Sequence, residues 1–234
     1  MNIVVTGASR GIGYELAKSF LAEQGNRVVA VARNRTKLER LNEEITGLKG
    51  NSRLNFLSFD LSQENFSDIL IPFIVEKLTK VDVLVNNAGL MINKEITRLS
   101  DEDFNRLFNV NVKSVFKLVK DLLPYFGSPA HIVNISSMGG VQGSAKFKGL
   151  SLYSASKGAL NVLTECLAEE LKDKNIKVNS LALGAVQTEM LSEAFPGYRA
   201  PMQPTEMARF IKDFAYNGHR FFNGKILPVS VSTP

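Results

Sequence analysis

The 234-residue sequence has one cysteine, two histidines and no tryptophan. The shortage of cysteine argues against a disulfide-bonded protein, and the shortage of histidine and cysteine together argues against a zinc site. Cys166 stands alone, so the chain cannot close an internal disulfide, which argues against a small secreted domain held together by disulfides. His131 and His219 lie far from Cys166 and from each other in the sequence, whereas zinc sites use closely grouped ligands. We therefore expect neither a disulfide framework nor a bound metal.

Long apolar runs are lacking as well. The apolar stretches at 69–75 and 81–85 fall well short of the about 18 residues that a membrane-spanning helix needs. The opening residues, MNIVVTG, have the pattern of a strand and a turn rather than of a basic and then apolar leader. We therefore expect a protein of the reducing cytoplasm that does not enter a membrane.

Charge of one sign is only slightly in excess, because 28 basic residues face 23 acidic ones and the formal net charge is +5. Basic residues that bind nucleic acid gather on one face, whereas the densest basic group here has acidic neighbours, as a solvated helix surface does. That group comprises Arg33, Arg35, Lys37 and Arg40, among Glu39, Glu43 and Glu44. The sequence therefore predicts no nucleic-acid partner.

The sequence does contain a regular alternation of short apolar runs and longer amphipathic segments. The apolar runs predict strands at 2–6, 27–32, 54–59, 81–86, 131–136, 176–182 and 225–229. The amphipathic segments predict helices at 12–24, 36–46, 101–123, 152–173 and 205–215, the third of them capped by Ser100. No linker interrupts this pattern, so we expect one domain, 1–234, with an α/β fold. That fold is a Rossmann-like, doubly wound parallel sheet of seven strands with helices on both faces.

A glycine-rich turn, Thr6-Gly7-Ala8-Ser9-Arg10-Gly11-Ile12-Gly13, follows the first strand and opens the first helix. In a sheet of this kind ligands bind beyond the carboxyl ends of the strands. Glycines there let backbone N–H groups approach a pyrophosphate, and the helix N-terminus adds a partial positive charge. Two other interpretations stay open. One is a turn that binds nothing, and the other is the G-x-S-x-G elbow of a hydrolase, which needs an acid and either His131 or His219 as partners of Ser9.

Three further polar segments follow strands or open helices in the same way. They are Asn86-Asn87-Ala88-Gly89 after the fourth strand, Asn134-Ile135-Ser136-Ser137 at the end of the fifth, and Tyr153 to Lys157 on the next helix. Together with the glycine turn before them and a glycine-centred segment at Gly184 after them, they resemble the short-chain dehydrogenase/reductase family. The resemblance covers essentially the whole chain and implies an oxidoreductase that uses a nicotinamide cofactor.

Tyr153 and Lys157 are four residues apart, which places both side chains on one face of a helix. A free tyrosine has a pKa of about 10, and a nearby cation stabilises the phenolate. We expect Lys157 to lower the pKa of Tyr153 toward the range in which a general acid or base works best. An ordinary pair on an amphipathic helix is the alternative that this spacing alone leaves open.

The resemblance implies roles for neighbouring residues. Ser137, rather than Ser136, donates to the carbonyl oxygen of a substrate, in the manner of an oxyanion-hole side chain. Lys157 also binds the ribose of the nicotinamide, and Asn111 holds a water that relays protons to Lys157, with Asn109 as the competing residue. The catalytic residues that the resemblance implies are Asn111, Ser137, Tyr153 and Lys157.

The resemblance also implies which residues hold the cofactor. Thr188 contacts the nicotinamide carboxamide, and Asp60 lies beside the adenine, unless it serves only as a cap of its loop. The set expected to contact the cofactor is Gly7, Ser9, Arg10, Gly11, Ile12, Gly13, Arg33, Asp60, Leu61, Asn87, Ala88, Gly89, Tyr153, Lys157, Gly184, Val186 and Thr188.

The end of the second strand favours NADP(H) over NAD(H). NAD-dependent proteins of this fold place an acid there for the ribose 2′-hydroxyl, whereas this chain has Ala32-Arg33-Asn34. The planar guanidinium of Arg33 suits a 2′-phosphate, and Arg10 in the glycine turn is placed to clamp that phosphate from the other side. We therefore expect NADP(H) as the cofactor.

Two departures from the family pattern affect the expected pocket. Leu183 stands before Gly184 where the family usually has proline, which predicts a looser turn at the nicotinamide site. The stretch between Ser137 and Tyr153 is longer than usual, and the excess, GSAKFKGLSL, predicts a loop beside the substrate. Candidates for an apolar pocket wall, or else for ordinary packing, are Phe147, Met190, Leu191, Phe195 and Tyr198.

These features predict an enzyme that moves a hydride between NADP(H) and a carbonyl or secondary alcohol, a small molecule whose identity the sequence leaves open. A non-catalytic NADP(H)-binding regulator is the alternative, but a sensor needs no proton-transfer pair. We also expect a homodimer or homotetramer, because helices 101–123 and 152–173 carry apolar residues on more than one face. These residues include Phe104, Phe108, Val112, Phe116, Leu160, Leu163 and Leu167.

Overall fold

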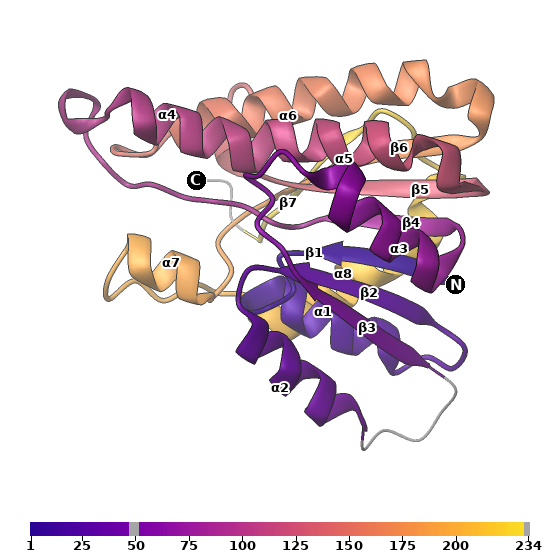
Figure 1. Ribbon diagram of the computed structural model, residues 1–234. Coiled ribbons are helices and arrows are strands. Elements are labelled where there is room, and N and C mark those ends of the chain that lie inside the picture. The colour runs from indigo at the N-terminus through magenta and orange to yellow at the C-terminus, as the bar shows by residue number, and fades with distance from the viewer. Residues whose placement is uncertain (47–51, 232–234) are drawn as a thin grey trace.

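A sheet of seven strands forms the centre of the computed structural model, which describes residues 1–46 and 52–231 (Figure 1). Neighbouring strands pair in parallel, in the order β3-β2-β1-β4-β5-β6-β7. The strands are β1 (Asn2–Thr6), β2 (Arg27–Ala32), β3 (Arg53–Ser58), β4 (Val81–Asn86), β5 (Phe126–Ser137), β6 (Ile176–Leu183) and β7 (Ile226–Val229). This arrangement confirms the predicted doubly wound parallel sheet.

Helices cover both faces of the sheet (Figure 1). One face carries α1 (Gly11–Leu21), α2 (Arg35–Thr46) and α8 (Pro204–Asn217). The other carries α3 (Ile71–Leu78), α4 (Asp101–Phe108), α5 (Ser114–Leu122) and α6 (Ser151–Glu170). A short helix, α7 (Glu189–Ala194), stands apart from both layers, beyond the carboxyl end of β6. Within the described ranges, no helix combines the length and the apolar character needed to cross a membrane.

The sheet has two hydrophobic cores because successive strand residues point to opposite faces. Ile3 and Val5 of β1 belong to the same core as Leu16 and Phe20 of α1. Val4 belongs to the core that α3, α5 and α6 build on the other face. All five side chains are fully buried. A strand covered on both faces needs a continuous apolar run, which is the pattern that predicts these strands from the sequence.

Most predicted elements differ from the structure by one to three residues at their ends, and two differ more. β5 begins at Phe126 rather than at 131, because Phe126 already pairs with Val81 of β4. The sequence predicts a loop for this segment because it contains Gly127 and Pro129, which are uncommon inside strands. The predicted helix 101–123 begins with the expected Ser100 cap but is divided into α4 and α5 by a π-helical turn at Asn109–Lys113.

Two helical segments are not among those that the sequence predicts. A π-helical turn at Phe66–Leu70 leads into α3, whose β-branched residues and Pro72 weaken the helical signal. None of the residues of α7 is buried. An apolar stripe is the main sequence sign of a helix, so the exposure of α7 explains why the sequence pattern does not reveal it.

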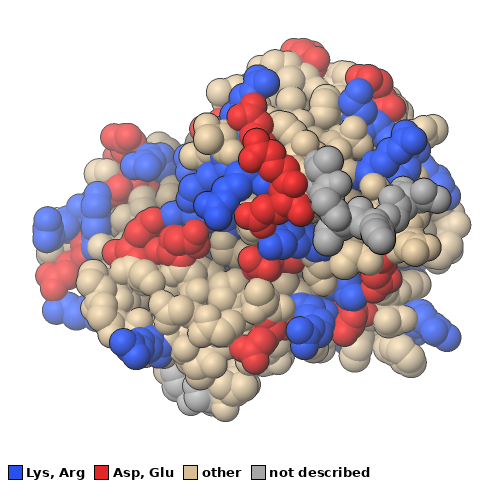
Figure 2. Space-filling model, turned by 90° about the horizontal axis from the view of Figure 1, so that it is seen from below, with Lys and Arg blue, Asp and Glu red and all other residues tan. Residues whose placement is uncertain are grey.

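Two of the three basic residues on α2 form ion pairs along the helix. Arg35 pairs with Glu39 at 2.8 Å and Arg40 pairs with Glu44 at 3.2 Å, both at the i,i+4 spacing. On the face shown in Figure 2, Lys and Arg side chains lie among Asp and Glu side chains rather than in one basic field. This is the solvated surface that the mixed charges of the segment predict.

The apolar residues of α4, α5 and α6 divide between the core and the surface. Leu160 and Leu167 are buried in the core against the sheet, so they are not among the apolar residues left for association. Phe104 and Phe116 are 44% and 45% exposed, and Phe104 stacks on Phe108 with 4.4 Å between the ring centroids. Apolar surface open to a partner is therefore supplied by phenylalanines and not by these leucines.

His131 has a structural role inside the fold. Its Nδ1 donates to the Ala215 carbonyl at 3.0 Å, and its Nε2 accepts from Asn179 Nδ2 at 3.1 Å. Burial lowers the pKa of His131 to about 4, with a smaller contribution from His219, whose ring centroid lies 5.6 Å away. The two histidines thus lie together at α8 and are not arranged as partners of Ser9, so the hydrolase interpretation has no support in the structure.

The buried neutral imidazole of His131 predicts a loss of stability in mild acid. Below pH 6.5 the unfolded chain binds a proton there, whereas the folded chain resists protonation until about pH 4, so the free energy of unfolding falls between these values. Between pH 7.5 and pH 5 this group should remove about 2 kcal/mol. Urea unfolding of the wild type and of His131→Asn at both pH values measures the effect. An equal pH dependence in the two proteins would contradict it.

Candidate active site

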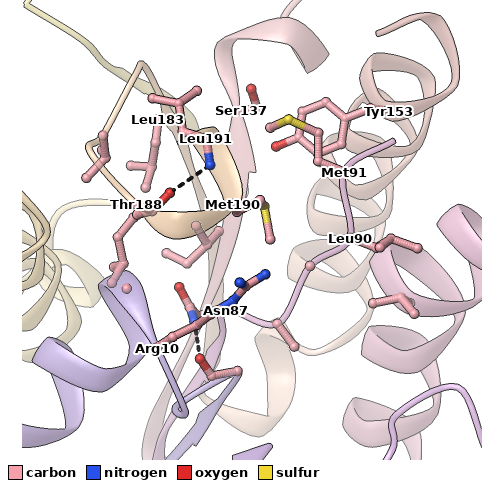
Figure 3. Close-up of a pocket in the computed structure, with 18 of the residues that line it drawn as sticks. Arg10, Asn87, Leu90, Met91, Ser137, Tyr153, Leu183, Thr188, Met190 and Leu191 are labelled. Carbon is pink, nitrogen blue, oxygen red and sulfur yellow. Dashed lines mark hydrogen bonds between the residues drawn. The ribbon is translucent and has the colours of Figure 1, made fainter. Parts of the chain in front are cut away.

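A cavity of about 1140 Å³ opens at the carboxyl ends of the strands, where a sheet of this topology binds ligands. Figure 3 shows Ser137 and Tyr153 at one end of the cavity and Arg10 and Asn87 at the other. Of the predicted site residues, those that line it are Gly7, Ser9, Arg10, Gly11, Ile12, Arg33, Asp60, Leu61, Asn87, Ala88, Gly89, Ser137, Tyr153, Lys157, Gly184, Val186 and Thr188. The other two, Gly13 and Asn111, lie behind this lining and support it.

Gly7 and Gly13 are required where the glycine turn packs on the turn after β4. Gly7 has φ +70°, and a Cβ there would lie 2.8 Å from the Ala88 Cα, while a Cβ at Gly13 would overlap Asn87 Nδ2. Asn87 Nδ2 donates to the Thr6 carbonyl at 3.0 Å. The Thr6 hydroxyl accepts the N–H groups of Asn87 and Ala88, both at 3.1 Å. These two glycines therefore have a structural reason to be present, independent of any ligand.

The N-terminus of α1 fits a phosphate group. Arg10 is its N-cap residue, and in this fully described helix neither a side-chain cap nor a first-turn acid occupies the N-terminus. The first N–H groups of a helix have no partner within it, and they carry its partial positive charge. Gly11 and Ile12, at the start of α1, line the cavity. This donor set suits the pyrophosphate of a dinucleotide.

Arg10 is engaged by Glu193 of α7, a contact that the sequence does not predict. Both terminal nitrogens of the guanidinium bond to the carboxylate, the second of them at 3.2 Å. The partners are 183 residues apart in the chain. Arg33 and Lys37, in contrast, are exposed on the cavity wall and form no ion pair with another described residue. The free cations at this end of the cavity are thus those that follow β2.

Asp60 and Thr188 each cap a local turn while lining the cavity. Asp60 Oδ1 accepts the N–H of Ser62 at 2.9 Å and its hydroxyl at 2.8 Å, as the loop-capping alternative for Asp60 requires. Thr188 is the N-cap of α7, and its hydroxyl accepts the Leu191 N–H at 3.3 Å (Figure 3). Both side chains therefore have a role in the fold, and their contact with a cofactor stays a prediction.

Tyr153, Ser137 and Lys157 meet where β5 ends and α6 begins. Ser137 is the last residue of β5, and its hydroxyl lies beside Tyr153 (Figure 3), close enough to affect the pKa of the phenol. Lys157 lies one helical turn further along α6, with Nζ 5.9 Å from the centroid of the Tyr153 ring. Its ammonium donates to the Ile135 carbonyl at 2.8 Å. The structure therefore brings three of the four predicted catalytic residues into one buried group.

Burial determines the protonation of this group. It raises the pKa of Tyr153, against the lowering effect of the neighbouring Ser137 hydroxyl, and it lowers the pKa of Lys157 to about 8. The prediction that Lys157 lowers the pKa of Tyr153 below its ordinary value is therefore wrong in this structure. Both groups have lost solvent, and the ammonium is bonded to a backbone carbonyl rather than to the phenol. Tyr153 consequently holds its proton at neutral pH.

Asn111, the fourth predicted catalytic residue, lies in the π-helical turn between α4 and α5. Its Oδ1 accepts the Leu90 N–H at 2.8 Å, and its Nδ2 donates to the Leu90 carbonyl and to the Ser156 hydroxyl, both at 2.9 Å. A Cβ at Gly89 would lie 3.5 Å from Lys157 Nζ and 3.6 Å from Asn111 Oδ1. Asn111 and Lys157 therefore approach the same point of the chain.

Two neighbours of these residues complete the arrangement. Ser156 also donates to the Tyr153 carbonyl at 2.7 Å, so it ties Asn111 to α6, a role that its place beside Lys157 in the sequence does not reveal. Asn109, the competitor of Asn111, lines the cavity instead of joining the buried group. The geometry thus separates the two asparagines, which the sequence alone leaves as alternatives.

The turn at Gly184 is held in place, so the looseness predicted from Leu183 is wrong. β6 continues through Leu183, which is in register with Ser137 of β5 and with Val229 of β7. The Gly184 N–H then donates to the Val229 carbonyl at 2.9 Å. Pairing on both sides of β6 fixes this turn without a proline.

The long segment before α6 borders the cavity, where the sequence predicts a loop. Phe147 and Leu150 line the cavity. Gly149, with φ +86°, accepts the Lys94 N–H at 3.0 Å through its carbonyl. The segment is thereby attached to the chain that follows β4, and it closes one side of the cavity.

Known proteins share both the sequence pattern and the fold. A family model described as short chain dehydrogenase matches residues 1–199. The 3-oxoacyl-[acyl-carrier-protein] reductase FabG of Thermotoga maritima is 31% identical, with 97% of this chain and 94% of the relative covered. Two solved structures are similar over nearly their whole length. The 3-ketoacyl-(acyl-carrier-protein) reductase from Brucella melitensis complexed with NADH has a TM-score of 0.85 at 29% identity, covering 98% of this chain and 96% of that one. A short chain dehydrogenase from Burkholderia cenocepacia in complex with NADP has a TM-score of 0.87 at 25% identity, covering 99% and 96%.

Glu193 competes with an anionic ligand for Arg10, so we predict that its removal strengthens cofactor binding. Glu193→Gln should bind NADPH about two- to fivefold more tightly than the wild type, a small gain because exposed ion pairs are weak. Fluorescence titration measures the affinity. Glu95→Gln is the matched control, since it removes an exposed carboxylate that pairs with Lys148 outside the cofactor end. An unchanged or weaker affinity in Glu193→Gln would show that the ligand does not recruit Arg10.

Proposed function

The chain belongs to the short-chain dehydrogenase family, and from this premise we propose that it transfers a hydride between NADP(H) and the carbonyl or secondary alcohol group of a small molecule. The nicotinamide of the bound cofactor supplies or accepts the hydride. The protein's own residues hold the cofactor, orient the substrate and move the proton. The observation that carries the proposal is the grouping of the Ser137 and Tyr153 hydroxyls beside Lys157 at one end of the cavity (Figure 3).

Ser137 and Tyr153 act on the carbonyl oxygen of the substrate. Negative charge develops on this oxygen during reduction, so two positioned hydroxyl donors stabilise the transition state more than the ground state. Because burial raises the pKa of Tyr153, the phenol still carries its proton at neutral pH and donates it to the oxygen. Alcohol oxidation needs the deprotonated phenol, so that direction is favoured at higher pH.

Lys157 and Asn111 return the proton to Tyr153. The pKa of Lys157, lowered by burial to about 8, lets its ammonium exchange a proton close to neutral pH. Lys157 Nζ and Asn111 Oδ1 both approach Gly89, an arrangement that suits a relay water between them. Leu90 and Ser156 fix the Asn111 amide, so its oxygen keeps this orientation.

Cofactor binding is assigned to the opposite end of the cavity. The N–H groups at the start of α1 would hold the pyrophosphate, and the exposed cations Arg33 and Lys37 after β2 would favour a 2′-phosphate over a hydroxyl. Asn87 to Gly89, Asp60 and Thr188 line the same cavity, where the first two segments would contact the dinucleotide and Thr188 would bind the nicotinamide amide. These positions support NADP(H) as the cofactor.

Self-association and location remain part of the proposal. The exposed Phe104 and Phe116 support a dimer or tetramer built through α4, α5 and α6. The lone Cys166 supports a cytoplasmic location.

Tyr153→Phe tests the proton donor. The variant keeps the ring and deletes the hydroxyl, so we predict that kcat for ketone reduction falls by about 10²- to 10⁴-fold, the usual contribution of a general acid. The dissociation constant of NADPH should stay within about twofold. Tyr125→Phe, on the surface after α5, is the matched control and should keep full activity. Wild-type turnover in Tyr153→Phe would remove Tyr153 from the mechanism, and NADPH binding without oxidation by any carbonyl compound would favour a regulator.

Arg33→Asp tests the choice of cofactor. An acid at this position repels a 2′-phosphate and accepts a bond from a 2′-hydroxyl, so the affinity for NADPH should fall by at least about tenfold while the affinity for NADH is kept or improved. Titration of the wild type and of Arg33→Asp with NADPH and with NADH measures these affinities. Arg35→Asp is the control, because Arg35 pairs with Glu39 on α2. Equal affinities of the wild type for NADPH and NADH would refute the preference.

A further inference from the structure

We propose that the substrate is an uncharged ketone or aldehyde whose substituents are hydrocarbon, alkyl or aryl, rather than a sugar or a keto acid. The inference rests on the proposed carbonyl chemistry and concerns the walls of the same cavity. We call the part around Ser137 and Tyr153 the substrate end. Its walls are Met91, Leu150, Leu183, Met190, Leu191 and Phe195.

These apolar walls come from several separate elements. Met91 and Phe195 pack against the cluster that contains Leu150 and Tyr153, so the phenol itself is set in an apolar surface. Leu183 is in register with Ser137. In Figure 3 it lies on the same side as Leu191, opposite Tyr153. The walls therefore enclose the two hydroxyls from different directions.

Polar side chains near the substrate end already have partners within the chain. Lys157 donates to a backbone carbonyl of β5 at 2.8 Å, and Asn93 donates to a carbonyl of α7 at 2.8 Å. Arg10 is bonded to Glu193, and Glu189 lies against the glycine turn, on the cofactor side. The six apolar walls named above thus present hydrocarbon to a substituent of the carbonyl carbon.

Two free cations of the cavity, Arg33 and Lys37, follow β2 and belong to its cofactor end. Arg106 lines the cavity from α4, together with Asn109 and Val110 of the π-helical turn that follows. None of the six apolar walls supplies a cation. A substrate carboxylate held among these walls would therefore have no counter-ion there, and its desolvation would not be repaid.

The expected selectivity follows from these surroundings. Each methylene moved from water to such walls improves binding by about fourfold until the space is filled. Each hydroxyl buried without a hydrogen-bond partner weakens binding by about tenfold. A six-carbon chain with hydroxyl groups should therefore bind far less well than the plain hydrocarbon chain.

Hexanamide and gluconamide test this inference without any reaction, because both are unreactive six-carbon carbonyl compounds that differ in their hydroxyl groups. Calorimetric titration of the full chain, alone and with saturating NADP⁺, gives both dissociation constants. Hexanamide should bind at least about tenfold more tightly than gluconamide. Equal binding, or tighter binding of gluconamide, would overturn the substrate class.

Kinetics with NADPH separate this inference from the proposed function. The kcat/KM should rise by about threefold or more per methylene from 2-butanone to 2-hexanone, and D-fructose and acetoacetate should be at least about tenfold poorer than 2-hexanone. Leu191→Asn places an amide in the wall and should lower kcat/KM for 2-hexanone about tenfold through KM. Ser192 is the next residue but does not line the cavity, so Ser192→Asn should leave kcat/KM for 2-hexanone unchanged.

The possible failures point to different conclusions. If D-fructose or acetoacetate is reduced as well as 2-hexanone, the substrate class is wrong and the carbonyl reductase stands. If no carbonyl compound consumes NADPH while hexanamide still binds preferentially, the proposed function is wrong and the apolar character of the site is upheld.

Discussion

The close packing of the turn after β1 on the turn after β4 sets the geometry of the whole cavity. The Thr6 hydroxyl holds two backbone N–H groups of the second turn, and the absence of a side chain at Gly7 and Gly13 lets the turns touch. This contact places the open N-terminus of α1 next to Gly89, which Lys157 Nζ and Asn111 Oδ1 approach. The proposed phosphate-binding end and the proposed proton-transfer end are therefore held at a fixed separation by one junction of two strands.

Burial gives the proton-transfer end its chemical character. Taking Lys157 out of water lowers its pKa to about 8, so its ammonium exchanges a proton close to neutral pH, whereas the same burial raises the pKa of Tyr153, which stays protonated there. The carbonyl of Ile135 and the hydroxyl of Ser137 compensate part of the lost hydration. Tyr153 therefore already carries the proton that a carbonyl oxygen needs during reduction, before any substrate binds.

Sequence patterns predict most of the fold because they report burial, and they predict less of the site because its contacts are non-local. The continuous apolar strands, the glycine turn and the spacing of Tyr153 and Lys157 are local signals, and each corresponds to a feature of the structure. The contact of Arg10 with Glu193 joins the glycine turn to a helix that buries none of its residues, so the sequence marks Arg10 but gives no sign of its partner. The direction of the Tyr153 pKa shift likewise depends on solvent exclusion by distant segments, which the spacing with Lys157 does not contain.

The central claim is that this chain passes a hydride to a carbonyl carbon while Tyr153 supplies the proton. NADPH deuterated at the transferable position of the nicotinamide C4, incubated with the protein and 2-hexanone in ordinary water, tests it most directly by mass spectrometry of the alcohol. The account predicts one deuterium on the carbinol carbon and an unlabelled hydroxyl proton drawn from solvent. Alcohol without deuterium at that carbon, from cofactor labelled on either face, would contradict it.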